Sequence, residues 1–150
     1  MRYSRRSNLI KLLGVVAVVI IAAAAFALPA YNDRARRSEL QEAFQNLSDI
    51  QVWMENFHNY GKTFARVDTC GAAVVPPERA QYFSYACALD TTAGAPPGQS
   101  YTATAKGKSR HTAGFSFRID QTKARATAAI PADWGPLPAD ARSAWVDRKP

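Results

Sequence analysis

The side chains whose chemistry is easiest to predict are two histidines and two cysteines. The histidines, His58 and His111, are far apart in the chain, and neither belongs to the cluster of convergent ligands that a metal site requires. The sequence also lacks a Ser/His/Asp grouping, a glycine-rich phosphate loop and an acid–base pair of carboxylates. We therefore expect a protein that is not an enzyme and that uses no cofactor, metal or small-molecule substrate.

A local basic cluster is the second candidate for chemistry. Lys106, Lys108 and Arg110 lie with His111 in the turn between two predicted strands, where a hairpin tip could contact a polyanion such as DNA. A solvated turn whose charges protect the strand edges explains the same cluster and is favoured. The net charge of +7 adds little, because much of the excess lies near the N-terminus and the rest, about +3, is diffuse.

The elements that must position these residues begin with an apolar segment. No charged or strongly polar residue occurs from Leu12 to Leu28, and Lys11 is the one interior charge of residues 9–30. A helix of roughly 20 apolar residues spans the hydrocarbon core of a bilayer. We predict a transmembrane helix at residues 9–30 after a basic cytoplasmic leader at residues 1–8. Lys11 then lies near the cytoplasmic end, where its amine can reach the headgroups.

The basic residues predict the orientation of this helix. Arg2, Arg5 and Arg6 precede it and favour a cytoplasmic N-terminus with the rest of the chain exported, although other arginines follow the segment. A cleaved signal peptide ending near Ala27 is the alternative. The apolar run exceeds the roughly 7–15 residues of a signal peptide, and a second helical pattern follows it directly. Both observations favour an uncleaved anchor.

That second pattern, residues 31–60, is amphipathic. Its apolar residues are spaced by three or four and form one stripe, with polar residues such as Glu39, Glu42, Asn46 and Gln51 on the other faces: Leu40, Phe44, Leu47, Ile50, Met54 and Phe57. No glycine occurs between Val15 and Tyr60. We predict one helix from Leu9 to Asn59 with a kink at Pro29.

The remaining residues, 61–150, predict a small head. A connecting loop at 61–80 precedes alternating patterns within 81–130 that begin near Phe83, Tyr101, Phe115 and Arg125, and residues 131–150 form an irregular tail. Short turns between strands favour an antiparallel meander, which needs the helical stripe as its partner. The predicted fold is α+β, a long helix packed on roughly four antiparallel strands. Trp134 and Trp145 are expected to be core residues more than ligand platforms.

The two cysteines, Cys70 and Cys87, both fall in this exported part. An even pair of cysteines in a small domain of an oxidising compartment predicts a disulfide, with two buried free thiols as the alternative. Such a bridge would tie the loop after the helix to the first strand and stabilise the fold by about 3 kcal/mol.

The order of these elements, and several stretches of sequence, resemble the type IV pilins. The matching stretches include Ala27–Asp33, Arg36–Glu39, Leu47–Gln51, Asn59–Gly61 and Ile130–Gly135, which are similar to PilE-like minor pilins of Gram-negative bacteria. The resemblance implies a subunit of the type IV pilus, or fimbrium, or of its assembly machinery. Adhesion, twitching motility and DNA uptake are the activities of such pili. The implied partners are the membrane, other pilin subunits and assembly proteins.

The N-terminal end departs from the pilin pattern. Pilins are cleaved after a glycine and carry phenylalanine next and a glutamate four residues beyond it, but Ser7, Asn8 and Leu12 occupy these places here, and Lys11 adds an opposite charge. A second cysteine pair, frequent in pilin tails, is missing, so we expect packing alone to hold the tail.

Three locations follow from these expectations. The first is a single-pass inner-membrane protein with a periplasmic head that can pass to the pilus and cell surface. The second is an unprocessed, membrane-tethered binding module, and the third is a secreted binding protein.

Overall fold

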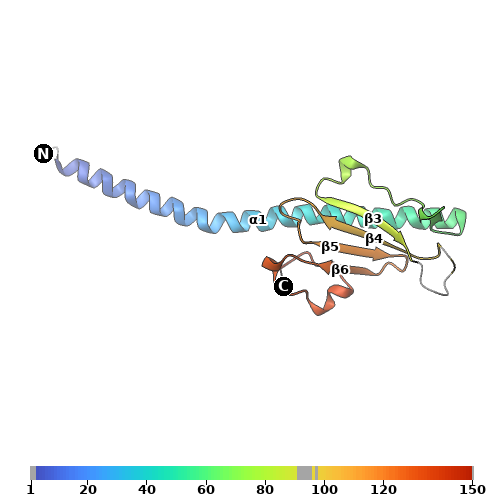
Figure 1. Cartoon of the computed structure of the whole chain (residues 1–150). Coiled ribbons are helices and arrows are strands. Elements are labelled where there is room, and N and C mark those ends of the chain that lie inside the picture. The colour runs from blue at the N-terminus through green and yellow to red at the C-terminus, as the bar shows by residue number, and fades with distance from the viewer. Residues whose placement is uncertain (1–2, 91–95, 97, 150) are drawn as a thin grey trace. The chain divides into compact units, whose positions relative to one another are not determined.

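One continuous helix, α1, runs from Tyr3 to Gly61 (Figure 1). The computed structural model describes the backbone of residues 3–90, 96 and 98–149, and the side chains of α1 at residues 15–22 and from residue 31 on. The chain divides into two units, Met1–Ala35 and Arg36–Pro150, so α1 contributes to both. The helix includes leader residues from Tyr3 on and ends close to the predicted stop, with Lys62 in the left-handed conformation. The kink at Pro29 stays a prediction.

The second unit, here called the head, contains a four-stranded antiparallel sheet in the order β3-β4-β5-β6. Each strand pairs with the next along the chain, which confirms the predicted meander. The strands lie side by side in Figure 1: β3 (Phe83–Leu89), β4 (Tyr101–Gly107), β5 (Ser116–Asp120) and β6 (Arg125–Ala129).

Shorter elements were not predicted. A hairpin of two-residue strands, β1 (Ala65–Arg66) and β2 (Thr69–Cys70), lies inside the expected loop 61–80. Strands this short leave no alternating pattern to detect. Single turns of 3₁₀ helix follow β2 and β6: η1 (Pro77–Arg79), η2 (Ala132–Trp134) and η3 (Ala139–Arg142).

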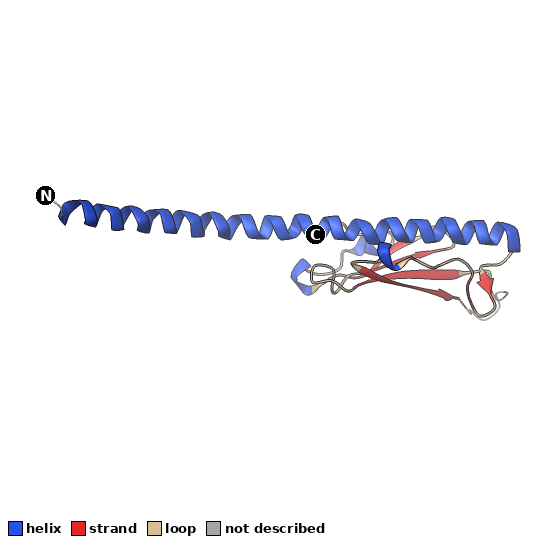
Figure 2. Cartoon of the chain, turned by 90° about the horizontal axis from the view of Figure 1, so that it is seen from above, coloured by secondary structure: helices blue, strands red, loops and turns tan. Residues whose placement is uncertain are grey.

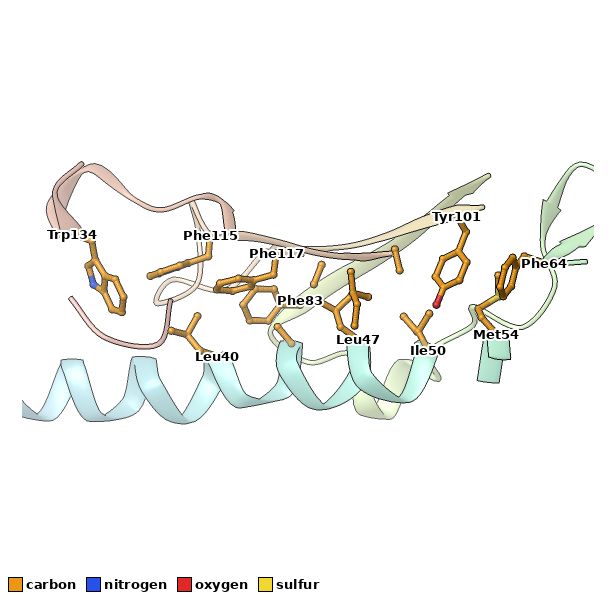
Figure 3. Packing of buried hydrophobic residues seen from close by; sticks show 14 residues of the cluster. Leu40, Leu47, Ile50, Met54, Phe64, Phe83, Tyr101, Phe115, Phe117 and Trp134 are labelled. Atoms are coloured by element: carbon orange, nitrogen blue, oxygen red, sulfur yellow. The ribbon is translucent and has the colours of Figure 1, made fainter. Parts of the chain in front are cut away.

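The core of the head lies between the C-terminal part of α1 and one face of the sheet (Figure 2). Leu40, Leu47, Ile50 and Met54 point from the helix toward the strands and are buried (Figure 3). The sheet contributes Phe83, Tyr101, Phe117 and Ile119, and Phe115 joins them from the residue before β5. The predicted stripe therefore forms the helical side of the core, with Phe44 and Phe57 half-buried at its margins.

Polar residues of α1 are also buried, which the single stripe did not predict. Asn46 is 2% exposed, and its amide donates hydrogen bonds to the Arg79 carbonyl (2.7 Å) and the Tyr85 hydroxyl (2.9 Å). Gln51 is buried as well. The contact face of the helix is wider than one stripe because loop residues cover its side, and hydrogen bonds offset the cost of burying an amide there.

The expectation that packing alone holds the tail was wrong. Trp134 is buried edge-to-face against Phe115, with ring centroids 4.7 Å apart. The tail also forms hydrogen bonds with the sheet: the Thr127 hydroxyl donates to the Ala144 carbonyl, and the Trp145 indole donates to the Arg118 carbonyl, each at 2.9 Å. Trp145 stacks on Phe44, and the Arg125 guanidinium lies over its ring. The tail is therefore fixed to both layers of the head.

Two tyrosines of the core differ in how their hydroxyl groups are satisfied. The Tyr85 hydroxyl accepts from Asn46 and donates to the Glu42 carbonyl (3.2 Å), whereas the buried Tyr101 hydroxyl has no hydrogen-bond partner among the described residues. Burial raises the pKa of both groups, and that of Tyr101 goes from 10.0 to about 12. An unpaired buried hydroxyl costs free energy that a phenylalanine does not.

We therefore expect opposite outcomes for two matched substitutions. Tyr85→Phe should lower the free energy of unfolding by about 1 kcal/mol, while Tyr101→Phe should leave it unchanged or raise it. Because the folded pKa of Tyr101 is raised, the stability of the native chain should be complete below pH 10 and fall as the pH rises toward 12, less so in Tyr101→Phe. Urea unfolding of the full chain in neutral detergent at pH 7 and pH 11 measures both effects. Equal losses in the two variants would contradict this account.

Candidate functional site

The described part of the N-terminal unit presents an apolar helix surface. Val15, Val18, Val19, Ile20 and Ile21 are each at least 60% exposed, and Val16 is 47% exposed. Consecutive residues point around the whole circumference of a helix, so no polar face remains over this stretch. A helix that is apolar all round is stable when lipid or other protein covers it. Residues 15–22 are therefore the first candidate functional surface.

The predicted processing and assembly residues lie next to this surface. Ser7, Asn8, Lys11, Leu12 and Pro29 are positions of α1 whose side chains fall outside the described residues. Of the predicted span 9–30, side chains are described at 15–22. Within the described part of the chain, no helix combines the length and apolar content needed to cross a bilayer. The transmembrane helix stays a prediction.

The predicted disulfide is present and joins β2 to β3. Cys70 and Cys87 are bonded, with their Cα atoms 6.0 Å apart. The bridge holds the β1–β2 hairpin and the loop after it against the sheet. Next to it, Gly71 lies so close to the Phe57 ring that a side chain at this position would overlap the ring. The loop after β2 is thus fixed both to the sheet and to the end of α1.

A second apolar surface lies beside this loop. A groove of about 480 Å³ separates Trp53, Phe57 and Tyr60 on α1 from loop residues Ala72, Val74 and Pro76. Tyr60 is 92% exposed and Val74 is 77% exposed. The lining of the groove is mostly apolar and aromatic, and Asn56 is the amide among its described residues. The head therefore carries an aromatic groove at the C-terminal end of α1.

Two glutamates fix the C-terminal part of α1 to the rest of the head. The Glu42 carboxylate accepts hydrogen bonds from the backbone N–H groups of Gln81, Tyr82 and Phe83 at 2.9–3.1 Å. The Glu39 carboxylate accepts one from the Ser109 hydroxyl (2.6 Å) and contacts His111 Nδ1 at 2.7 Å. The sequence placed both glutamates on the polar side of the helix. Their role depends on contacts between distant parts of the chain, which periodicity does not report.

The basic turn is only partly available to a ligand. Lys108 Nζ donates to the Ala80 carbonyl at 2.6 Å, and His111 is held by Glu39. Lys106 and Arg110 are exposed. Lys108 is exposed as well, but its amine already attaches the turn to the chain before β3.

The remaining shifted groups belong to structural contacts. A hydrogen bond from Arg36 lowers the pKa of Asp133, and hydrogen bonds from Gln51 and Lys123 lower that of Glu55. Among the described side chains, no three cysteine, histidine, aspartate or glutamate residues gather into a possible metal site. The arrangement supports binding and packing through the two apolar surfaces.

Comparison of the chain with protein-family models, with curated proteins and with solved structures gives no match. Any proposal for the function therefore depends on the described geometry and on the sequence.

The Glu42 contacts give a direct test of how α1 is held. Glu42→Ala removes one acceptor from three backbone N–H groups, and we expect the free energy of unfolding to fall by about 2 kcal/mol. Glu78→Ala is the matched control, because that glutamate is exposed, and it should change stability by less than about 0.5 kcal/mol. Urea titration of both variants measures the difference. Equal stability of the two variants would show that Glu42 does not anchor the helix.

Proposed function

We propose that the chain is a minor type IV pilin or a pilin-like structural subunit of the pilus or its assembly machinery. The observation that carries this proposal is the division of α1. Its residues 15–22 expose valine and isoleucine on all sides, while residues 40–54 of the same helix supply the helical side of the core of the head. The core of the head does not use residues 15–22, so folding of the head does not explain their apolar character.

The proposed mechanism is an exchange of apolar contacts. Before assembly, residues 9–30 lie in the inner membrane, and the head lies in the periplasm, where the Cys70–Cys87 disulfide suits the oxidising conditions. During assembly, the same helix leaves the lipid and packs among the helices of neighbouring subunits. Either environment covers the valine and isoleucine side chains, so close packing between helices supplies the preference for the assembled state. The work is assembly without chemical turnover.

The resemblance to pilins also supports an alternative. A membrane-tethered binding module would keep the pilin fold without cleavage. This alternative rests on Ser7, Asn8 and Leu12, which stand where pilins carry the glycine, phenylalanine and glutamate. The aromatic groove beside Trp53 and Tyr60 would then be a surface for a partner. A secreted head released near Ala27 is the third candidate.

The N-terminal residue of the mature protein distinguishes these candidates. The full chain is produced in a Gram-negative host with and without a prepilin peptidase, and its mass is measured intact. We expect a start at Asn8 that depends on the peptidase. Ser7→Gly restores the glycine of the pilin site and should increase the cleaved fraction, and Lys11→Glu tests the missing acidic charge in the same assay.

The other outcomes decide against the pilin. An intact Met1 in both the native chain and Ser7→Gly would contradict processing and support the tethered module. A start near Leu28 would instead support secretion.

A further inference from the structure

The outer face of the sheet, which points away from α1, carries a groove of about 440 Å³. Its floor consists of small residues of β4 and β6, including Thr102, Ala126 and Ala128, which alternate with the buried residues of these strands. Leu137 and Arg142 of the tail form one wall, and Arg118 of β5 lies in the groove. A volume of this size can hold a small ligand.

Several arginines of the head have a partner among the described residues. Arg36 and Arg79 form ion pairs with Asp133 and Asp49, and Arg125 lies over Trp145. Arg118 and Arg142 form no ion pair with a carboxylate of the described residues, and their side chains donate no hydrogen bond to that part of the chain. Two arginines thus line one groove without an acceptor among the described residues.

Among the described residues, Asp120 is the one carboxylate that lines the groove, and one of its two oxygens accepts hydrogen bonds from its own turn. Its Oδ1 accepts hydrogen bonds from the Thr122 N–H (2.8 Å), the Thr122 hydroxyl (2.6 Å) and the Ala124 N–H (3.1 Å). The charge lining the groove, two arginines against one aspartate, is therefore positive. Ala126 and Ala128 are small residues of the same lining.

We propose that this groove binds a small anionic ligand through Arg118 and Arg142. The planar guanidinium group donates two parallel hydrogen bonds to the paired oxygens of a carboxylate or a phosphate, and these charge-assisted bonds are stronger than neutral ones. The shared chemistry is an oxyanion carried by a ligand that fits over Ala126 and Ala128. The groove belongs to the head alone, so the inference is independent of the proposed pilin function.

The test uses the full chain, with its disulfide intact, in maltoside micelles at low salt and pH 7. Inorganic phosphate and citrate are titrated separately while backbone amide signals are followed by NMR. We expect saturable shifts centred on Arg118, Ala126, Ala128 and Arg142. Saturation with phosphate alone, citrate alone or both supports the site and defines which oxyanion it accepts.

Variants separate a built site from general attraction to a basic protein. Arg118→Gln and Arg142→Gln should each weaken binding about tenfold. Arg66→Gln is the matched control, because Arg66 is an exposed strand arginine outside the groove, and it should leave the affinity within about twofold. Ala126→Glu places a carboxylate on the groove floor and should abolish binding while the remaining amide spectrum is kept.

Two results would overturn the proposal. One is a shift that grows linearly with phosphate and with citrate and never saturates. The other is an equal loss of affinity in Arg66→Gln and Arg118→Gln.

Discussion

The contact between α1 and the four-stranded sheet is the interaction on which the rest of the head depends. A four-stranded meander with one apolar face needs a covering layer, and residues 40–54 of the helix supply it. Glu42 then fixes the chain before β3 to the helix, and Glu39 fixes the β4–β5 turn to it. The disulfide fixes the loop that follows the helix. The helix covers one face of the sheet, and the tail borders a groove on the other.

Local patterns were sufficient to predict the main elements of the fold. The alternation near Phe83, Tyr101, Phe115 and Arg125 predicted β3 to β6, the stripe from Leu40 to Met54 predicted the buried side of α1, and the cysteine count predicted the bridge. The rest required contacts across long sequence separations. The burial of Asn46 depends on Arg79 and Tyr85, and the groove of Arg118 and Arg142 exists because the tail folds beside β6. No short window of sequence contains both partners of such a contact.

Of the candidate functional surfaces, the sequence predicted those formed by one continuous segment and missed those formed by segments far apart in the chain. The apolar run is visible in the sequence, because every residue of it has the same character. The aromatic groove beside Tyr60 is formed by α1 and a loop that the disulfide positions. In the basic turn, Lys108 donates a hydrogen bond to the Ala80 carbonyl, a contact that the sequence did not predict. The proposed role therefore depends on one helix with two kinds of cover: the sheet of its own head for residues 40–54, and lipid or neighbouring helices for residues 15–22.

The accessibility of single cysteines along α1 tests this division most directly. Val18→Cys places a thiol in the exposed apolar stretch, and Tyr60→Cys places one at the exposed end of the helix. A membrane-impermeant maleimide is then applied to membranes from cells that produce each variant. The account predicts fast labelling of Tyr60→Cys and labelling of Val18→Cys only after denaturation in strong detergent. Equally fast labelling of both thiols in untreated membranes would contradict it.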